Sequence, residues 1–533
     1  MSTHARKRNM RANTVLTGAL CMLSASAAAG CFYVTVDDCE VTHTCPGGTG
    51  STSSGTSSST GSSGTGGTPI TCIPSESPDP IAESCGVFVS SSLGMDDMAK
   101  DRGGKGKPFK SIGAALVKAG VGRVYVCAES FSEAVTISTG VDLYGGLDCK
   151  SWAYVGATKK TALTAAADLV PLTLGNASGA VSVEDFAITA AAAKAPGGSS
   201  IAVLANGATA SLTRCDLASG DGMAGKDGDP GDPNAMPALA GTAGNNGSNA
   251  CGGDVVSGNP GGGAVANMCG GADPVSVGGG GGKGSVTNGG SGDAGQTGAL
   301  GAPGDGEPNM GPWTCASNGA GHAGDDGKAG DVGPGAAGKG SLSAMGYAGT
   351  TGQPGTPGTP GQGGGGGGGA KGGLICPANG AGASGGSGGA GGCAGKAGSD
   401  GAAGGASFAL VSYQATVLLT DCSVMASKGG SGGKGGDAQA GGDGGPGGTG
   451  GKKIGLSSNA CNGGNGGNGG NGGPGGGGLG GHSIAIAYSG KPVARMGKTM
   501  LKPGAKGLGG LGGSNNMTNA GADGLAASEQ VFP

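Results

Sequence analysis

The residues of this chain that could do chemistry are charged side chains on the short β-type runs that follow Cys85. Glycoside hydrolysis needs two carboxyl groups on one face, one to give a proton and one to activate water or attack the sugar. The runs offer Asp142, Glu184, Asp185, Arg214, Asp216 and Asp421. Arg214 and Asp421 occupy equivalent positions of an internal repeat, and we interpret them as a surface ion pair rather than a catalytic pair. No catalytic residue is therefore predicted.

Sequence motifs for nucleotides and calcium fail in their details. Matches to G-x-G-x-x-G are numerous because glycine fills 134 of 533 positions, and none stands between a strand and a helix. The triplet 497–499 resembles the end of a phosphate-binding loop, but Pro492 occupies the place of its first glycine. The nonapeptide 432–440 resembles a calcium-binding repeat, but Gln439 replaces the apolar residue and no tandem copy follows.

Aspartates and histidines predict no metal site. Four aspartates cluster in DGMAGKDGDPGD (221–232), where we interpret them as solvated loop carboxylates rather than cation ligands. Beyond the predicted leader, the histidines are His43, His322 and His482, and none is near another in the sequence. Neither a histidine metal site nor a Ser-His-Asp triad is visible, and we predict no cofactor.

The first thirty residues predict an export signal. Four basic residues precede an apolar stretch, 14–29, that is too short to span a bilayer stably. The stretch ends in AAGC (28–31), which resembles the lipobox of bacterial lipoproteins, although that family usually has leucine where Ala28 stands. The resemblance implies a diacylglyceryl group on Cys31 and an effectively permanent membrane anchor. Ordinary secretion, with cleavage after alanine, is the alternative.

The residues after Cys31 predict a place and a tether. Phe32 follows the cysteine, and the absence of aspartate there implies, by the same resemblance, the outer membrane or cell surface. Residues 46–68 contain only small, polar and proline residues, so they predict a flexible tether with a root-mean-square reach of about 27 Å. Without the leader the chain has a net charge of about −8. Nucleic acid is therefore excluded as a predicted partner.

Sixteen cysteines in an exported chain predict disulfides. Cys127 and Cys149 flank one predicted coil and form one candidate pair. Cys215 and Cys422 share one position of the internal repeat, where stacked strands would lie about 4.8 Å apart, and form the other. Six more lie in glycine-rich sequence: Cys251, Cys269, Cys315, Cys376, Cys393 and Cys461.

Short strands and one helix must position these residues. Runs with alternating apolar residues predict strands at 86–92, 123–128, 133–137, 140–146, 169–175 and 180–189. Between the first two runs, residues 108–120 place Ile112, Ala115 and Leu116 on one helical face, and Gly120 can close the helix. One helix followed by many short strands excludes a doubly wound α/β sheet.

Residues 103–146 resemble the opening of right-handed parallel β-helix proteins of the pectin-lyase-like class, in which a Pro-Phe-x-Thr/Ser-Ile helix caps the first coil. With its lipobox and glycine-rich sequence, the whole chain resembles the large glycine-rich, PGRS-like lipoproteins of myxobacterial type. We therefore predict an all-β fold. It is a right-handed parallel β-helix with one N-terminal capping helix, interrupted by very long glycine-rich loops of low or irregular structure.

An internal repeat supports stacked coils. Residues 200–215 align without gaps to 407–422, and 483–496 begins like a third copy. The copies should be neighbours in space, because such repeats bury apolar faces only against one another. Two alternatives remain open for the glycine-rich chain between them. Its cysteines staple it into compact polyglycine-type strands bonded backbone to backbone, or they pair locally in otherwise mobile chain.

These predictions divide the chain into eight parts. They are a signal peptide (1–30), a lipidated N-terminus and tether (31–84), N-terminal β-helix coils (85–220), a glycine-rich insertion (221–405), a coil (406–428), a second insertion (429–481), a coil (482–500) and a tail (501–533). The predicted function is that of a non-enzymatic, adhesive or structural surface lipoprotein that contacts the membrane through its lipid and polysaccharide or extracellular matrix through its loops. The alternative is a carbohydrate-active β-helix enzyme, a polysaccharide lyase or hydrolase.

Overall fold

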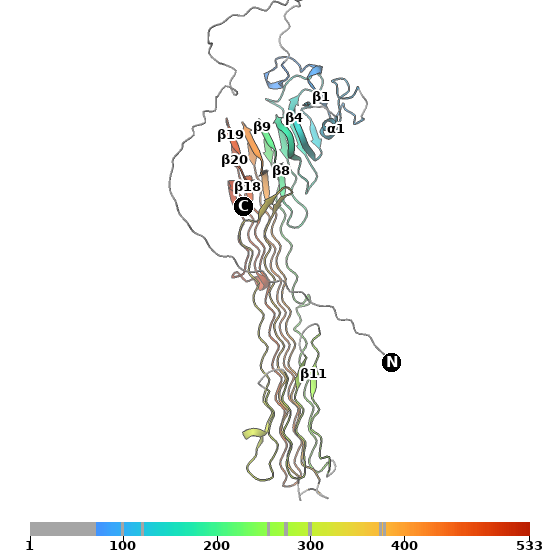
Figure 1. Cartoon of the computed structure of the whole chain (residues 1–533), viewed down its shortest axis with the longest axis vertical. Coiled ribbons are helices and arrows are strands. Elements are labelled where there is room, and N and C mark those ends of the chain that lie inside the picture. Colours follow the sequence, from blue (N-terminus) through green and yellow to red (C-terminus); the bar gives the residue numbers. More distant parts are fainter. Residues whose placement is uncertain are drawn as a thin grey trace, which may run out of the picture. The chain divides into compact units, whose positions relative to one another are not determined.

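Short strands, most of them parallel, form the folded part of the chain (Figure 1). The structure is a computed structural model that describes residues 71–97, 101–118, 122–252, 256–270, 275–296, 301–372, 376 and 380–533. All of them belong to one unit, Pro69–Pro533. The predicted leader, Cys31, His43 and the tether lie outside the described residues.

The larger sheet is parallel throughout and has eleven strands. Eight follow one another across it: β1 (Val87–Val89), β2 (Arg123–Cys127), β4 (Val135–Leu147), β6 (Leu172–Glu184), β8 (Ser200–Asn206), β15 (Ser407–Tyr413), β18 (Ser483–Ser489) and β21 (Ala526–Val531). Three more extend it beside β6: β9 (Thr209–Thr213), β16 (Thr416–Thr420) and β19 (Ala494–Met496).

The smaller sheet is also parallel and has six strands. They are β3 (Ser130–Ser132), β5 (Thr161–Thr164), β7 (Phe186–Thr189), β10 (Asp216–Ala218), β17 (Ser423–Met425) and β20 (Met500–Lys502). Two antiparallel hairpins lie outside both sheets: β11 (Val265–Asn267) with β12 (Ser276–Gly278), and β13 (Ser341–Ser343) with β14 (Gly346–Ala348). Short helical turns are η1 (Pro74–Glu76), η2 (Glu83–Cys85), η3 (Cys315–Gly319) and η6 (Gly513–Asn515).

The core lies between the two sheets because the chain passes from one to the other in each repeat. The central residues of the smaller sheet stack in register: Phe131, Leu163, Ile188, Leu217, Val424 and Leu501. They belong to the same apolar cluster as inward-facing residues of the larger sheet such as Val183 and Leu212. The all-β prediction is therefore confirmed at the level of two parallel sheets around one core.

The predicted helix is present as α1 (Ile112–Val117). Ser111 caps it, since the Ser111 hydroxyl accepts the N–H of Ala114 at 3.2 Å. The carboxylate of Glu133 accepts the N–H groups of Ile112 and Gly113 at 2.8 and 3.0 Å. A negative charge at this place is favourable because the N-terminus of a helix carries a partial positive charge. Ile112 enters the core. No helix among the described residues is long and apolar enough to cross a bilayer.

The internal repeat pairs as its alignment predicts. Ser200 lies opposite Ser407 where β8 meets β15, and Asp216 lies opposite Ser423 where β10 meets β17. Both pairs keep the offset of the sequence alignment. Ser483, the start of the third copy, lies opposite Ser407 on the other side. The copies are therefore adjacent strands although long glycine-rich segments separate them in the sequence.

Those segments run side by side as extended chain (Figure 1). We call 222–250, 321–336, 352–370, 382–405, 429–451 and 460–481 the glycine rod. Its backbone hydrogen bonds recur at every third residue. Between two central segments the donors and acceptors are Gly392 to Gly467 at 2.9 Å, Gly395 to Gly470 at 2.9 Å and Gly398 to Gly473 at 3.0 Å. A three-residue period is the signature of the extended threefold helix that polyproline and polyglycine form.

Seven consecutive glycines, 363–369, mark a segment with neighbours on every side. Successive N–H groups donate in rotation to three segments: Gly363 to Gln296, Gly364 to Gly389 and Gly365 to His322. The rotation starts again at Gly366, which donates to Asp293. Because a threefold helix turns a new face to each neighbour, all three of its positions must lack a side chain here.

Close approach of backbones, rather than an unusual φ, is what requires these glycines. A Cβ on Gly366 would lie 1.9 Å from the carbonyl oxygen of Gly280, and one on Gly364 would lie 2.2 Å from that of Gly464. The expectation of low or irregular structure is wrong for the described part of these segments. Backbone hydrogen bonds replace the apolar burial that glycine cannot supply, so the alternative of polyglycine-type strands is the one observed.

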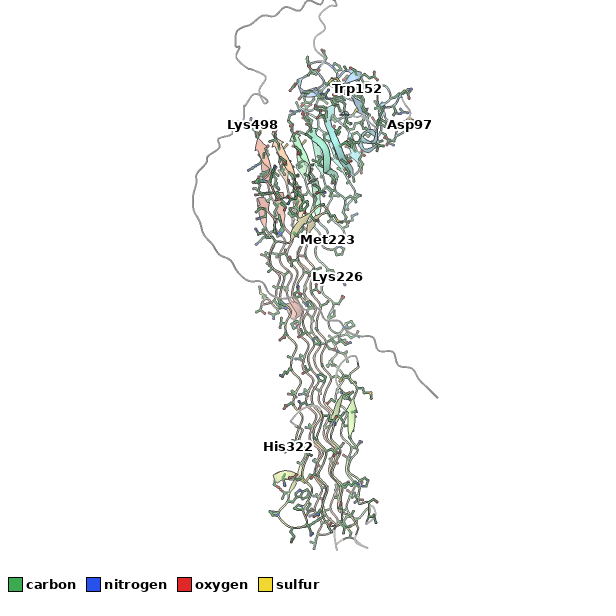
Figure 2. The ribbon with its side chains drawn as sticks, in the orientation of Figure 1. Asp97, Trp152, Met223, Lys226, His322 and Lys498 are labelled. Atoms are coloured by element: carbon green, nitrogen blue, oxygen red, sulfur yellow. A yellow bond between two sulfur atoms is a disulfide. The ribbon has the colours of Figure 1, made fainter. Side chains whose placement is uncertain are left out.

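Long side chains such as Lys226 and His322 project from the rod (Figure 2), whereas small ones such as Ser384 and Ser387 are buried within it. In the run NGGNGGNGG each asparagine side chain accepts a backbone N–H of the neighbouring segment. The pairs are Asn465 with Gly447, Asn468 with Gly444 and Asn471 with Gly441, each at 2.9 Å. Thr356 and Thr359 do the same for Asp331 and Lys328 at 2.7 Å. These side chains satisfy N–H groups that have no backbone partner.

Disulfides join parts of the glycine-rich chain that are distant in the sequence, and two of them attach to the rod itself at Cys393 and Cys461. The six cysteines of the glycine-rich stretches pair as Cys251–Cys376, Cys269–Cys393 and Cys315–Cys461, with sequence separations of 125, 124 and 146. A fourth disulfide, Cys72–Cys85, lies beside β1. The alternative in which these cysteines pair locally in mobile chain is therefore wrong. Four disulfides fit the predicted export, because such bonds persist in oxidising compartments.

Candidate functional sites

A corner of the strand-rich part gathers the predicted carboxylates. Asp185, Arg214 and Asp421 occupy equivalent positions after β6, β9 and β16, and Gly497 continues the series after β19. All four have φ between 52° and 62°, the left-handed region that disfavours side chains other than those of Asn and Asp. Arg214 at such a position costs on the order of 1–3 kcal/mol unless its surroundings hold it.

Asp185 and Glu184 hold Arg214. The guanidinium donates to both carboxylate oxygens of Asp185 at 3.0 and 2.8 Å and to Glu184 at 2.7 Å. The Tyr154 hydroxyl donates to Asp185 at 3.2 Å. Hydrogen bonding to Asp185 raises the pKa of Arg214, and burial raises the pKa of Glu184 despite its ion pair with Arg214. The cluster is a satisfied ionic network with its base permanently charged.

The predicted pair of Arg214 with Asp421 is wrong, because each finds a better partner. Arg214 donates to the carboxylates of Glu184 and Asp185. Asp421 accepts the N–H of Lys498 at 2.7 Å. The other predicted carboxylates form single ion pairs. Asp142 lies 3.4 Å from Arg123, and Asp216 lies 2.8 Å from Lys160.

Trp152 completes the core rather than a sugar-binding surface. It is 2% exposed, and its ring meets Phe88 edge to face with the ring centres 4.8 Å apart, so it is not available to stack on a ligand. Tyr154 is half-buried, its hydroxyl donates to Asp185, and burial raises the pKa of that hydroxyl.

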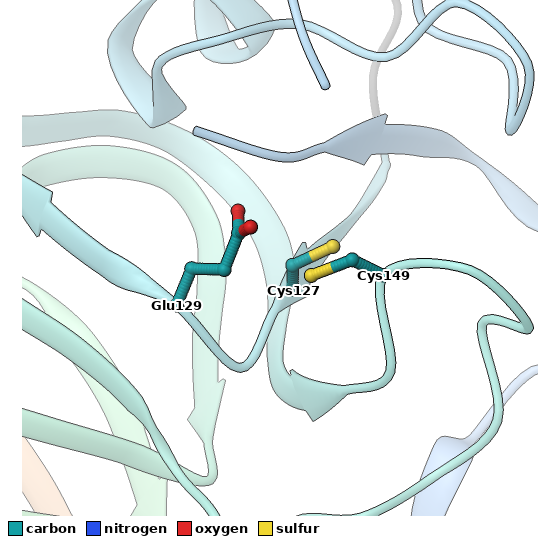
Figure 3. A group of neighbouring side chains, drawn as sticks. All are labelled: Cys127, Glu129 and Cys149. Atoms are coloured by element: carbon teal, nitrogen blue, oxygen red, sulfur yellow. The ribbon is translucent and has the colours of Figure 1, made fainter. Parts of the chain in front are cut away.

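A second cluster joins Cys127, Glu129 and Cys149 (Figure 3). Cys127 is the last residue of β2 and pairs with Leu147, the last residue of β4, so Cys149 follows two residues later. The N–H of Glu129 donates to the carbonyl of Cys127 at 2.7 Å in a tight turn. The two sulfurs and a carboxylate oxygen all lie within 4.8 Å of one another.

Serine groups fix the carboxylate of Glu129. One oxygen accepts the hydroxyls of Ser90 and Ser91, each at 3.0 Å, and the N–H of Ser92 at 3.3 Å. The other oxygen accepts the hydroxyl of Ser92. Burial works to raise the pKa of Glu129, but the serine hydroxyls outweigh it and the pKa lies below its usual value.

The cluster faces a cavity of about 360 Å³. Its lining includes Glu129, Cys149, Lys150 and Lys159. Cys127 is buried, whereas Cys149 is half-buried, and burial raises the pKa of both thiols. Without a bound ion both sulfurs are therefore neutral at physiological pH.

The four cysteines predicted to form disulfides are free thiols in the structure. They do lie in the predicted pairs. The N–H of Cys215 donates to the sulfur of Cys422 at 3.4 Å, and both residues are buried. Burial raises the pKa of Cys215. A disulfide in either pair stays a prediction, and for Cys127 and Cys149 the adjacent carboxylate offers a different use of the sulfurs.

The histidines within the described residues form no common site. His482 is buried, its Nε2 lies 2.8 Å from the carbonyl of Lys339 and its Nδ1 accepts the N–H of Leu525 at 2.9 Å. It therefore carries its proton on Nε2 and serves the contact between rod and strands. His322 is exposed on the rod.

The aspartates of 221–232 cap backbone groups instead of gathering around a cation. Asp221 accepts the N–H of Lys428 at 3.0 Å, and Asp227 accepts that of Lys434 at 2.7 Å. In the calcium-like nonapeptide, Gln439 is 8% exposed and bonds the N–H of Lys396 and the carbonyl of Met236, each at 3.1 Å. Gln439 thus belongs to the rod rather than to an ion site.

Sequence reasoning missed Glu129 and the serines that orient it. Two signals were available: the spacing Cys127-x-Glu129 at the end of a strand, and the triple serine that follows β1. Neither is specific alone, because the pairing of β1 with β2 is what brings the serines beside Glu129. Comparison of the chain with protein-family models, with curated proteins and with solved structures finds no match.

Proposed function

We propose that the protein is a non-enzymatic lipoprotein of the cell surface that uses the glycine rod to contact polysaccharide or extracellular matrix. The observation that carries the proposal is the rod itself. In its interior, backbone groups of neighbouring segments bond to one another. The side chains at the outward positions of the segments are therefore not needed for packing and are exposed to a partner. The ladder of bonds from Gly222 to Ala250 runs along the partner segment from Lys428 to Lys452, which corresponds to a length of about 74 Å at about 3.1 Å per residue.

The strand-rich part is, in this proposal, a right-handed parallel β-helix of the pectin-lyase-like type. Its support is the alternation of successive strands between two parallel sheets and the helix α1 at the first coil. A scaffold of this kind accepts long insertions between coils, because the cost of closing a loop grows only with the logarithm of its length. Each long rod insertion leaves the smaller sheet after β10 or β17 and enters the larger sheet at β15 or β18, which pairs with the equivalent strand of the preceding copy.

The anchor and tether are inferred from the sequence. Lipid on Cys31 would hold the chain at the outer membrane, and residues 46–68 would separate the fold from the headgroups. Replacing Cys31 with serine is expected to move the protein from the detergent phase to the aqueous phase. Protease treatment of intact cells should remove the rod, and a chain that stays intact would overturn surface display.

A binding assay tests adhesion against catalysis. The purified full chain is incubated in detergent with a panel of bacterial and plant polysaccharides, and both retention of the protein and release of new reducing or unsaturated ends are scored. Retention without release is the expected result. Release of ends would overturn the non-enzymatic proposal. If the protein is not retained and no ends are released, adhesion is overturned and a structural role is left.

The rival proposal, a carbohydrate-active enzyme, has one observation in its favour. Glu184, whose pKa burial raises, lies beside Asp185 at the corner, as a general acid and its partner would. Against it, Arg214 occupies both carboxylates. If the assay releases ends, Glu184→Gln should abolish release while Asp421→Ala and Asp216→Ala test the remaining carboxylates, with circular dichroism confirming that each variant folds.

A further inference from the structure

We propose that Cys127, Glu129 and Cys149 form a binding site for Zn²⁺. Two thiolates and one carboxylate are ligands that zinc takes in proteins, and three protein ligands are the usual number for a zinc ion that keeps an open position. Ligand atoms on a tetrahedral zinc ion lie roughly 3.5–3.8 Å apart, given bonds of about 2.0–2.3 Å. The three atoms here lie within 4.8 Å of one another, so small side-chain rotations complete the site.

The backbone sets these three residues before any ion arrives. Cys127 is fixed by the pairing of β2 with β4, and the tight turn after it carries Glu129. Cys149 follows the end of β4, where Asp148 accepts the N–H groups of Lys150 and Ser151 at 3.1 and 2.8 Å. The site is therefore assembled from two adjacent strand ends rather than from mobile chain.

The serine groups around Glu129 favour a metal ion over a disulfide. Three hydroxyls and one N–H aim the carboxylate, as groups behind a metal ligand commonly do. A disulfide between Cys127 and Cys149 would be neutral and would gain nothing from a half-buried negative charge beside it. A divalent cation with two thiolates gains from that charge directly.

Cys215 and Cys422 show the contrast within the same fold. Their thiols contact backbone carbonyls, with the sulfur of Cys215 at 3.5 Å from Val183 and that of Cys422 at 3.3 Å from Leu212. No carboxylate among the described residues completes a three-ligand group with them. This pair is therefore not a zinc site.

The open position of the proposed site faces the cavity that Glu129 and Cys149 line. Water from the cavity would supply the fourth ligand. Lys150 and Lys159 on the same lining would favour a small anion in its place.

Zinc content and spectroscopy of the full chain test the proposal. The chain is purified in detergent without chelators, zinc is measured by atomic emission, and Co²⁺ is exchanged in to reveal sulfur-to-metal charge-transfer absorption. We expect one zinc ion per chain, loss of zinc and of the charge-transfer band in Cys149→Ser, and at least about tenfold weaker binding in Glu129→Gln. Asp142→Asn, which changes a carboxylate that pairs with Arg123 at the other end of β2 from Cys127, is the control and should bind as the unaltered chain does.

Three results would overturn the proposal. The first is a Cys127–Cys149 disulfide in the non-reducing peptide map of the purified chain. The second is zinc affinity that is the same in Cys149→Ser as in the unaltered chain, and the third is no binding by the reduced chain at micromolar zinc. Far-UV circular dichroism confirms folding of each variant, and Asp142→Asn separates loss of a ligand from loss of any carboxylate on these strands.

Discussion

Replacing Gly366 with alanine should destabilise the glycine rod although it adds only one methyl group. The new Cβ would lie 1.9 Å from the carbonyl oxygen of Gly280. Carbon and oxygen atoms that are not bonded rarely approach closer than about 3.3 Å, so the segment at 279–282 must retreat by roughly 1.4 Å. Hydrogen bonds do not stretch that far.

The bonds at risk give the magnitude. The N–H of Gly279 donates to Gly364 at 2.9 Å, and that of Gly282 donates to Gly367 at 2.8 Å. Losing two buried backbone bonds costs about 2 kcal/mol net. Overpacking of the remaining contacts adds about 1–3 kcal/mol. We therefore expect Gly366→Ala to lower the free energy of unfolding of the rod by about 4 kcal/mol.

Gly263→Ala is the matched control, because a Cβ there would meet only the side-chain amide of Asn245 at 3.8 Å. The chain has two tryptophans, and Trp152 lies in the strand-rich part whereas Trp313 lies against the rod. Urea unfolding in a Trp152→Phe background then follows the rod through Trp313 fluorescence. Amide hydrogen exchange of peptides from 352–405 localises the effect.

Equal behaviour of the two alanine variants would refute the reasoning. If Gly366→Ala unfolds at the urea concentration of Gly263→Ala and keeps its exchange protection, the rod is not held by close contact of backbones. If both variants lose stability equally, the effect comes from alanine in extended chain and not from the contact with Gly280.

Other groups give three further predictions. Arg214→Ala leaves the buried Asp185 carboxylate unpaired and should cost about 3 kcal/mol in urea unfolding, most of which Asp185→Asn in the same chain should restore. Replacing Cys269 and Cys393 by serine should lower stability by about 2–4 kcal/mol, and an unchanged midpoint would mean that this bond is not formed. Burial lowers the pKa of His482 below 6.5, so the unfolded chain binds the proton more readily and stability should fall as pH drops below about 6.5; His482→Asn should flatten that dependence, and identical pH profiles would contradict it.

The strand-rich part could be predicted because its signals are visible in residue types. Alternating apolar residues mark strands such as β2, and the spacing of Ile112 and Ala115 marks the helix α1. Both signals lie within a few positions of the chain. The register of β8 against β15 follows from an ungapped repeat between two distant segments, which a single sequence also displays.

The rod was not readable in the same way, because apolar periodicity does not report on backbone-to-backbone packing. Residues 363–369 are all glycine, so they show no apolar pattern from which a strand or helix could be predicted. In the structure the length of a glycine run reflects how many sides of a segment are covered, since each covered side removes one side chain in three. The candidate zinc site was missed for a related reason: Ser90 reaches Glu129 only through strand pairing.

Because its backbone bonds recur at every third residue, the length of the rod is set by the number of three-residue units in each segment. Inserting one or two residues into 382–405 would turn side chains such as Ser399 toward a neighbouring backbone, unless the extra residues leave the ladder as a turn. The segment 222–250 has such a turn at 232–237, where the chain advances seven residues (231–238) while its partner advances three (437–440) and the bonds resume beyond it. Adding one whole triplet to each segment preserves all contacts and extends the rod by about 9 Å. A change in reach that keeps every bond would therefore come in steps of three codons, coordinated among segments, while the paired strands at 407–425 and 483–502 need no compensating substitution.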